Sequence, residues 1–411
     1  MRQLFLLSLL VPAAAAQGIP RGDAIVSAFS HPAGTEGLWR VSSGGITTQI
    51  LGLGLAGSAG TGVNSVQLDP IDDRVWIGGI NSNGDTSGQV NWIRLSAGGT
   101  VAQFSQHGST GLPLSIAGIT FDDNGNPVVA SGRASGGGGI FRIDRATGAS
   151  TRIASLANGL HNAITRDDSG NLYLGIFDTV VGAGGGEIYR MAKNPDCSYR
   201  APSLLGTVSV PQVSSVAWCR DPSGGSNDVL LVTTFGSTFE MPATGGAARI
   251  IPAIGFLNWV DLDRGANRFL MPDDGSGPSN VFSLTRDYST AALHASLFAG
   301  TAGTLSCIDS NDDPAAELAA IPACPARDVP VTVELGVSCP PGQLAIVHIV
   351  APVSVPLLVA PAPGHGRVFV QLPGVVVPTG FPPGSLVLQA ACFDPVGNSL
   401  VVGRPVGWPA N

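Results

Sequence analysis

The stretch AGITFDDNGNPVVASGRASGGGGIFRIDRATGASTRIASL, residues 117–156, contains four short β-type segments separated by turns. β-branched and aromatic residues favour strands, and the DDNGN and RATG segments hold the Asp, Asn and Gly that tight turns prefer. The same order of segments recurs at residues 64–104, 162–194, 214–251 and 258–287. One four-stranded repeat cannot bury both of its faces alone, so the pattern predicts a β-propeller in which the repeats stack radially.

The spacing of the repeat predicts six blades. The β-branched markers of the first strands recur at intervals of 53, 45, 52 and 44 residues and are Val66, Ile119, Ile164, Val216 and Val260. The start of the chain lacks such a first strand and begins with segments 24–29, 37–42 and 47–53. Residues 302–309 resemble a first strand, and we expect them to complete that blade and close the ring, which removes exposed sheet edges.

The composition and the N-terminus indicate an exported all-β protein. Arg2, the apolar run 4–11 and the small residues up to Ala16 form a secretory signal pattern, too short to span a bilayer. Gly (56) and Pro (31) are abundant while charged residues make up only 12% of the chain, which favours short strands and turns over helices. The net charge of −8 with no basic cluster excludes a nucleic-acid partner. We expect a monomer that is secreted or held at the cell envelope.

The pattern of the sequence changes near Asp328. The chain is therefore predicted to have three parts: a signal peptide (1–16), the propeller (17–325) and a C-terminal domain (326–411). Six or so short apolar segments separated by Pro and Gly predict a small antiparallel β-sandwich in the last part. The apolar run 344–363 is interrupted by prolines and rich in β-branched residues, so two buried strands are expected there and not a membrane span. The domain is similar to terminal β-modules of exported bacterial proteins, which usually act in attachment or stabilisation.

The mature chain retains six cysteines, an even number that predicts disulfides in an oxidising compartment. Among fifteen possible pairings, the expected one joins Cys339 to Cys392, Cys307 to Cys324 and Cys197 to Cys219. No CxxC spacing supports a metal site made of cysteines.

A register of polar residues marks the predicted central channel. The positions two residues before each marker hold amides or small residues, and with His161 they form the candidate ligand site Asn64, His161, Asn162, Ser214 and Asn258. Amide groups at these positions suit water, a metal ion or a neutral polar ligand such as a glycan. They could equally serve only to satisfy strand ends and bind channel water.

Four aspartates follow the markers by three residues, namely Asp69, Asp122, Asp167 and Asp263. Their positions suit turns, where an Asp side chain accepts hydrogen bonds from the backbone, better than calcium ligation. The run Asp309, Asn311, Asp313 has calcium-loop spacing, but Pro314 stands where the loop needs glycine. We expect a short helix in DPAAELAA, residues 313–320, with Asp313 as its N-cap. No cofactor is expected, calcium being the weak alternative.

The segment GLHNAITRDDSGNLYLGIFD, residues 159–178, resembles the repeats of NHL propellers and of the gluconolactonase and strictosidine-synthase-like family. This resemblance covers about three quarters of the chain and implies a six-bladed propeller. The metal-dependent lactonases of that family place carboxylates around a divalent cation in the channel, and here no Asp or Glu occupies the register position. No GxSxG, HExxH or P-loop motif is present.

The leading hypothesis is therefore a non-catalytic propeller that binds a polar small molecule, a glycan or a protein partner in its channel or on one face. The first alternative is a divalent-metal-dependent hydrolase of the gluconolactonase type, with Asn162, Asn258 and His161 at its centre. The second alternative is a purely structural protein of the cell envelope.

Overall fold

The computed structural model describes the chain from Gly18 to Pro409 with short internal gaps, and the described residues form 32 β-strands. The residues outside the description are 1–17, 30–35, 53–61, 82–87, 97–98, 112–115, 132–137, 156–159, 178–184, 211, 222–226, 235, 252–258, 265, 274–277, 303, 312–314, 353 and 410–411. The expected signal peptide therefore lies outside the described residues. Among those that are described, no helix is long and apolar enough to cross a membrane.

The first sheet has eight strands in two antiparallel groups of four. One group runs in the order β3 (Thr47–Gly52), β2 (Gly37–Val41), β1 (Ala24–Phe29), β24 (Thr304–Ser310). The other consists of β4 (Gly62–Leu68), β5 (Val75–Asn81), β6 (Gln89–Leu95) and β7 (Val101–Ser109). The two groups are linked where Phe29 pairs with Gly62.

Four further sheets each contain four antiparallel strands that follow one another in the chain. One sheet is formed by β8 (Ile116–Phe121), β9 (Pro127–Ser131), β10 (Gly139–Ile143) and β11 (Ser150–Ala154). Its neighbour is formed by β12 (Leu160–Arg166), β13 (Leu172–Phe177), β14 (Gly186–Met191) and β15 (Ser203–Val208). Then come β16 (Val213–Cys219), β17 (Val229–Thr234), β18 (Ser237–Pro242) and β19 (Arg249–Ile251). The last comprises β20 (Asp261–Asp263), β21 (Arg268–Pro272), β22 (Pro278–Thr285) and β23 (Ala291–Ala302).

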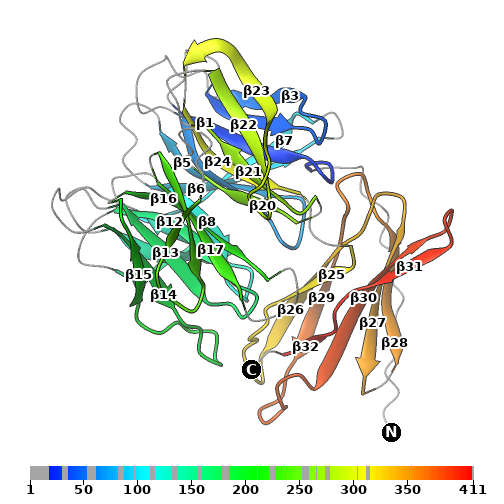
Figure 1. The fold of residues 1–411 in the computed structure, drawn as a ribbon. Coiled ribbons are helices and arrows are strands. Elements are labelled where there is room, and N and C mark those ends of the chain that lie inside the picture. The colour runs from blue at the N-terminus through cyan, green and yellow to red at the C-terminus, as the bar shows by residue number, and fades with distance from the viewer. Residues whose placement is uncertain are drawn as a thin grey trace, which may run out of the picture.

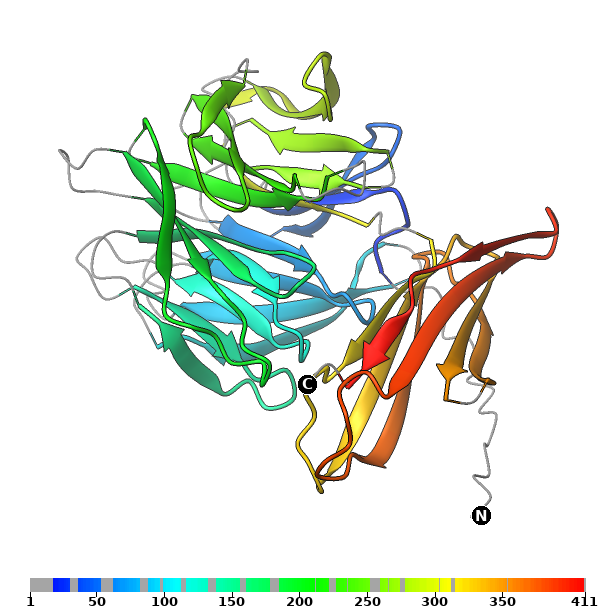
Figure 2. The same ribbon diagram turned by 60° about the horizontal axis from the view of Figure 1, so that its bottom comes forward.

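The late strand β24 completes the first group, as the missing first strand at the N-terminus predicts. It pairs antiparallel with β1, from Ala24 opposite Ser310 to Phe29 opposite Thr304. The first strands of successive groups then contact one another in the closed order β24, β4, β8, β12, β16, β20 and back to β24. Figures 1 and 2 show the sheets following one another around a common centre, which is the arrangement of a β-propeller.

Hydrophobic side chains are buried between successive groups and not within any one of them. One cluster joins Ile25 and Leu38 of the first group to Val66 and Ile77 of the second. Similar clusters follow around the ring, and the last joins Val281 of β22 to Ile308 of β24. A single four-stranded group would leave these side chains exposed to water, so packing of the groups against one another in the ring stabilises the fold.

The turns after the first strands use the aspartate chemistry expected from the sequence. Asp122 Oδ1 accepts the amides of Asn124 and Asn126, and Gly125 takes a positive φ of 72°. The next repeat places Asp167 in the same role toward the amides two and four residues on. The equivalent carboxylates Asp69 and Asp263 also accept backbone amides in their own turns. All four aspartates therefore accept backbone amides within their own turns.

Two further antiparallel sheets follow the propeller and share one hydrophobic cluster. The three-stranded sheet has the order β25 (Glu317–Ile321), β26 (Pro330–Ser338), β29 (Arg367–Val376). The other sheet contains β28 (Val355–Pro361), β27 (Leu344–Ala351), β30 (Leu386–Asp394), β31 (Ser399–Val402) and β32 (Val406–Trp408). The apolar run 344–363 forms the paired strands β27 and β28, as expected. Figure 2 shows this unit beside one face of the propeller.

The short helix expected over residues 313–320 is wrong. Residues Glu317–Ile321 form β25, which pairs with β26 through Ala320 opposite Leu335. Pairing to a neighbouring strand and burial of Leu318 outweigh the local helix preference of the alanines. The strand precedes the boundary expected at residue 325, and it belongs to the C-terminal pair of sheets. The expected N-cap, Asp313, lies outside the described residues.

Candidate functional site

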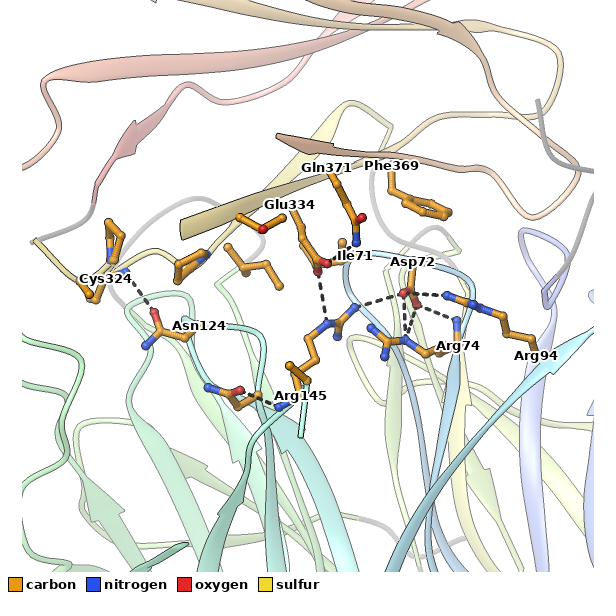
Figure 3. A pocket seen from close by; sticks show the side chains of 17 residues that line it. Ile71, Asp72, Arg74, Arg94, Asn124, Arg145, Cys324, Glu334, Phe369 and Gln371 are labelled. Atoms are coloured by element: carbon orange, nitrogen blue, oxygen red, sulfur yellow. Dashed lines mark hydrogen bonds and ion pairs between the residues drawn. The ribbon is translucent and has the colours of Figure 1, made fainter. Parts of the chain in front are cut away.

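A cavity of about 510 Å³ lies between the propeller and the three-stranded sheet. The propeller contributes the turn after β4, the turn after β8 and the turn after β10, through Asp72, Asn124 and Arg145. The sheet contributes the face directed away from its own core, through Glu334 on β26 and Gln371 on β29 (Figure 3). This space is called the interdomain cleft below.

Arg145 is the centre of the ion pairs in the cleft. Its Nη2 donates to Asp69 Oδ1 at 3.1 Å and to Asp72 Oδ2 at 3.2 Å, while Nη1 donates to the other oxygen of Asp69. Its Nε lies 3.3 Å from Glu334 Oε2 across the cleft. The Asp69 side chain is fully buried and also accepts the Trp76 indole N–H at 2.7 Å. Arg145 therefore connects the propeller to the C-terminal sheet electrostatically.

The charge of Asp69 is held by its neighbours. Burial alone would raise the pKa of this carboxyl, but the guanidinium groups of Arg145 and Arg74 outweigh burial and lower the pKa to about 2. Burial alone would lower the pKa of Arg145, but the carboxylates of Asp69, Asp72 and Glu334 outweigh burial and raise it. The central pair is therefore fully ionised at neutral pH.

Two more arginines continue this network toward the rim of the cleft. Arg74 Nε lies 2.9 Å from Asp72 Oδ2, and Arg94 Nε lies 2.8 Å from Asp73 Oδ1. Both guanidinium groups lie over the Trp92 ring, 5.7 and 5.4 Å from its centroid. Stacking on an aromatic face and pairing with carboxylates leaves these cations well satisfied.

A fourth arginine, Arg367, lies next to this network. It projects from β29, donates from Nη1 to the backbone carbonyl of Asp69, and lies 3.4 Å from Asn311 Oδ1. The whole network therefore contains four guanidinium groups and four carboxylates, of which Asp69, Asp73 and Arg367 lie behind the lining of the cleft. The cleft itself is lined by three arginines (Arg74, Arg94 and Arg145) and two acids (Asp72 and Glu334), so its lining carries a formal charge of +1.

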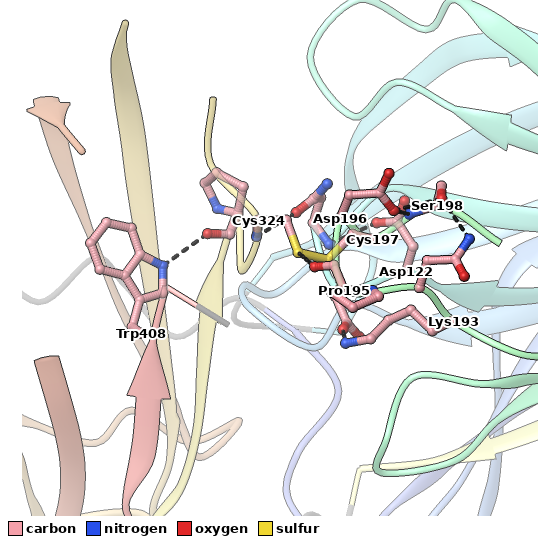
Figure 4. The surroundings of a disulfide bond; sticks show 12 residues. Asp122, Lys193, Pro195, Asp196, Cys197, Ser198, Cys324 and Trp408 are labelled. Atoms are coloured by element: carbon pink, nitrogen blue, oxygen red, sulfur yellow. Dashed lines mark hydrogen bonds and ion pairs between the residues drawn. A yellow bond between two sulfur atoms is a disulfide. The ribbon is translucent and has the colours of Figure 1, made fainter. Parts of the chain in front are cut away.

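A disulfide between Cys197 and Cys324 fixes one end of the cleft (Figure 4). It joins the turn between β14 and β15 to the segment after β25, with the two Cα atoms 6.1 Å apart. The adjacent backbone is also tied, because Ala323 N donates to the Asp123 carbonyl and Cys324 N donates to Asn124 Oδ1, both at 3.0 Å. The C-terminal unit is therefore bound to the propeller covalently as well as by polar contacts.

The structure corrects two of the three expected disulfides. Cys339 pairs with Cys392 inside the C-terminal unit, as expected. The pairings of Cys307 with Cys324 and of Cys197 with Cys219 are wrong, because Cys324 reaches Cys197 instead. Cys219 and Cys307 are buried free thiols, each packed in a hydrophobic cluster between neighbouring groups of strands. Burial raises the pKa of the Cys219 thiol to about 12, which disfavours the reactive thiolate form.

The structure describes the side chains of only two of the five residues proposed for the channel, Asn64 and Ser214. Asn64 is partly buried in β4, and Ser214 is buried in β16. His161 and Asn162 have their backbones in β12, but their side chains lie outside the described residues, as does Asn258 altogether. The channel site remains a prediction.

The side chains of the candidate calcium loop that begins at Asp309 bind other groups of the protein. Asp309 accepts the amide of Leu68, and Asn311 donates to the carbonyls of Ile19 and His365. These side chains therefore join the N-terminal segment to the propeller and to the C-terminal unit. Within the described ranges, no group of three or more His, Cys, Asp or Glu side chains is placed to hold a metal ion.

Asp261 is a carboxyl with a raised pKa at the seam where the ring closes. It lies on β20, and its Oδ2 accepts the Ser310 amide at 2.9 Å and the Ser310 hydroxyl at 2.5 Å. Burial raises the pKa of Asp261 to about 6 despite these two hydrogen bonds. The folded protein therefore holds this proton more tightly than the unfolded chain does.

This carboxyl makes stability depend on pH. Between about pH 4 and pH 6 the folded state binds more protons than the unfolded state, so the free energy of unfolding should fall as pH rises, by up to about 2 kcal/mol. Asp261→Asn should flatten that decline in urea titrations at pH 4, 5 and 6. The control Asp287→Asn alters an exposed carboxyl whose pKa is lowered to about 2, and it should leave the decline unchanged. An unaltered slope in Asp261→Asn would show that the carboxyl is not protonated at pH 5.

Comparisons with known proteins support the fold alone. No protein-family model matches the sequence, and a search of curated proteins finds no match. A chain of a nidogen/laminin complex is 12% identical with a TM-score of 0.50, covering 70% of this chain and 97% of its own. The periplasmic gluconolactonase PpgL of Pseudomonas aeruginosa is 13% identical with a TM-score of 0.44, covering 94% and 96%. A gluconolactonase of Xanthomonas campestris is 15% identical with a TM-score of 0.39, covering 63% and 92%.

Proposed function

We propose that this chain is an exported, non-catalytic binding protein that holds a polar ligand in the interdomain cleft. Its body is a six-bladed β-propeller, and a C-terminal β-sandwich supplies the second wall of the cleft. The observation that carries the proposal is the cleft itself, whose volume of about 510 Å³ falls in the usual range for small-molecule sites, roughly 300–1,000 Å³. The proposed ligand site is therefore on the face of the propeller that meets the C-terminal unit, and not in the central channel.

The chemistry of the cleft favours binding over catalysis. A general acid or base works best with a pKa close to the operating pH. Asp69 has a pKa of about 2, and it is fully engaged by Arg145 and Trp76. Arg145 in turn has its pKa raised further from neutrality. These groups can orient a ligand, but they are poorly suited to exchanging protons with it.

The count of six blades is supported by the closed ring of contacts between first strands and by the pairing of β24 with β1. The sandwich is supported by the hydrophobic cluster that both C-terminal sheets share. Export is supported by the signal pattern at residues 1–16 and by two disulfides.

A blocked-cleft variant tests this function. Gln371→Trp places a large ring in the cleft, and Gln106→Trp places the same ring at an exposed position on β7. Thermal shifts would be recorded with neutral oligosaccharides, dicarboxylates and short peptides as probes. We expect at least one probe to raise the melting temperature of the native protein and of Gln106→Trp, but not of Gln371→Trp. Equal shifts in both variants, or no shift with any probe, would refute binding in the cleft.

The second candidate is a divalent-metal-dependent hydrolase of the gluconolactonase type, acting from the channel. One observation favours it, because the raised pKa of Asp261 on a first strand would suit a general base. Hydrolysis of glucono-δ-lactone with added Ca²⁺, Mn²⁺ or Zn²⁺ tests this alternative. Turnover that depends on the metal and is lost in Asp261→Asn would replace the binding proposal with the enzyme.

A further inference from the structure

We infer that the ligand of the interdomain cleft is a neutral carbohydrate, a short oligosaccharide, gripped between the propeller and β29. This inference rests on the proposed function and deepens it by naming the ligand class. Three features of the cleft carry it: charged groups that are already paired with one another, unused hydrogen-bonding groups, and an exposed aromatic ring beside them.

The pairing of the charged groups argues against an ionic ligand. Arg145 is shared among Asp69, Asp72 and Glu334, and the arginines nearer the rim are paired with the neighbouring aspartates. A charged ligand would have to displace one of these partners and leave it buried without a counter-ion, which is costly. A ligand without charge leaves every pair intact.

The hydrogen-bonding groups that remain suit hydroxyls. Gln371 donates to Glu334 Oε1 at 2.7 Å, and Asn124 Oδ1 accepts the amide of Cys324. Within the part of the chain that the structure describes, the carbonyl of Gln371 and the amide nitrogen of Asn124 have no hydrogen-bond partner. One hydroxyl of an oligosaccharide can donate to the first, and a different hydroxyl can accept from the second.

Two buried atoms in the cleft also lack hydrogen bonds. Arg145 Nε and Glu334 Oε2 lie 3.3 Å apart as an ion pair, yet neither makes a hydrogen bond in suitable geometry among the described residues. The Arg145 side chain is only 9% exposed. Buried polar atoms without hydrogen bonds are costly, and after a small shift of these two side chains a ligand hydroxyl could accept from Nε and donate to Oε2.

An aromatic platform lies beside these groups. Phe369 is 38% exposed and precedes Gln371 by two residues on β29, so both side chains lie on the same face of the sheet. Gly336 stands opposite Phe369 on β26 and offers no side chain to cover the ring. A Cβ added to Gly336 would lie 2.7 Å from the carbonyl oxygen of Ile71, so the propeller backbone comes close there. The negative face of an aromatic ring suits the C–H groups of a sugar.

The test uses purified mature protein with neutral trisaccharides of glucose, xylose and N-acetylglucosamine, and with a glucuronate trisaccharide and trialanine as comparison probes. Saturation-transfer NMR identifies binders, and calorimetry measures their affinity. We expect at least one neutral trisaccharide to bind with one-to-one stoichiometry and the two comparison probes to give no binding.

Matched variants locate the site. Phe369→Ala and Gln371→Ala should each weaken the saccharide by about fivefold or more, since each removes one contact to the sugar. Phe104→Ala and Gln106→Ala alter exposed residues of the same types on β7 and should bind as the native protein does. Equal melting temperatures of all four variants would show that folding is retained.

The outcomes separate this inference from the proposed function. If only the glucuronate or trialanine binds, and Gln371→Ala weakens that binding, the cleft is a binding site but not for neutral carbohydrate. If a trisaccharide binds and the cleft variants do not affect it, the location is wrong. If no probe binds, both the inference and the proposed cleft function are overturned.

Discussion

Replacing Arg145 with methionine should lower the free energy of unfolding by about 3–5 kcal/mol, the range for removing one partner of a buried ion pair. Methionine retains much of the side-chain volume but removes the guanidinium that pairs with Asp69, Asp72 and Glu334. Asp69 is fully buried, so its charge would be left with Arg74, whose Nε is 3.7 Å away, and with the Trp76 indole. Urea denaturation at pH 7 measures this loss.

A surface arginine is the control for this change. Arg249 pairs with Glu240 at 2.7 Å, but its side chain is 66% exposed. Arg249→Met should cost at most about 1 kcal/mol, as is usual for exposed pairs. A loss of the same size in both variants would contradict the central role of Arg145.

The pH dependence of the Arg145→Met variant provides a second measurement. In the native protein the pKa of Asp69 is about 2, below its unfolded value, so this carboxylate contributes stability above about pH 4 that is lost as pH falls toward 2. Without Arg145 the pKa of Asp69 should rise. The deficit of the variant should therefore be largest at neutral pH and shrink on acidification. Asp69→Asn in the Arg145→Met background should recover part of it, because no buried charge is then left unpaired.

The features that could be predicted from sequence are those set by neighbouring residues. Asp122 and Asp167 accept amides two and four residues ahead, so a short motif is enough to identify each turn. The closing strand was also predictable, since the N-terminus begins one strand short and a matching strand follows the last repeat. In both cases the decisive information is local or repeats along the chain.

The cleft could not be predicted in the same way. Its walls come from turns of the propeller and from β26 and β29, which are distant in sequence, and neither wall carries a recognisable motif. Arg145 belongs to the turn segment RATG, where an arginine is expected to be exposed to solvent. Only the docking of the C-terminal sheet against the propeller places Glu334 3.3 Å from it. The helix expected over residues 313–320 is wrong for a similar, non-local reason. The conformation of Glu317–Ile321 is set by pairing with the strand β26, which lies further along the chain.

Replacing Cys197 and Cys324 together with serine should lower the free energy of unfolding by about 2–5 kcal/mol. The bond spans 127 residues, and cross-links that close long loops restrict the unfolded chain most. It also joins two units that are otherwise held by polar contacts such as Ala323 N to the Asp123 carbonyl. The double variant should be cleaved faster by protease in the segment between β24 and β26, since that segment is anchored by the bond. Denaturation and limited proteolysis under non-reducing conditions measure both effects.

The control for the disulfide is Cys219→Ala with Cys307→Ala, which removes two thiols and leaves both disulfides in place. This control should lower the free energy of unfolding only by the cost of small cavities between neighbouring groups of strands. Its sensitivity to protease in the segment between β24 and β26 should not change. Peptide mapping of the native protein without reduction should recover Cys197 linked to Cys324. A map that linked Cys307 to Cys324 would contradict the structure and would require Cys307 to leave its hydrophobic cluster between β4 and β24. The cleft would then lose the covalent anchor at its edge, because Cys324 is the cysteine that lines it.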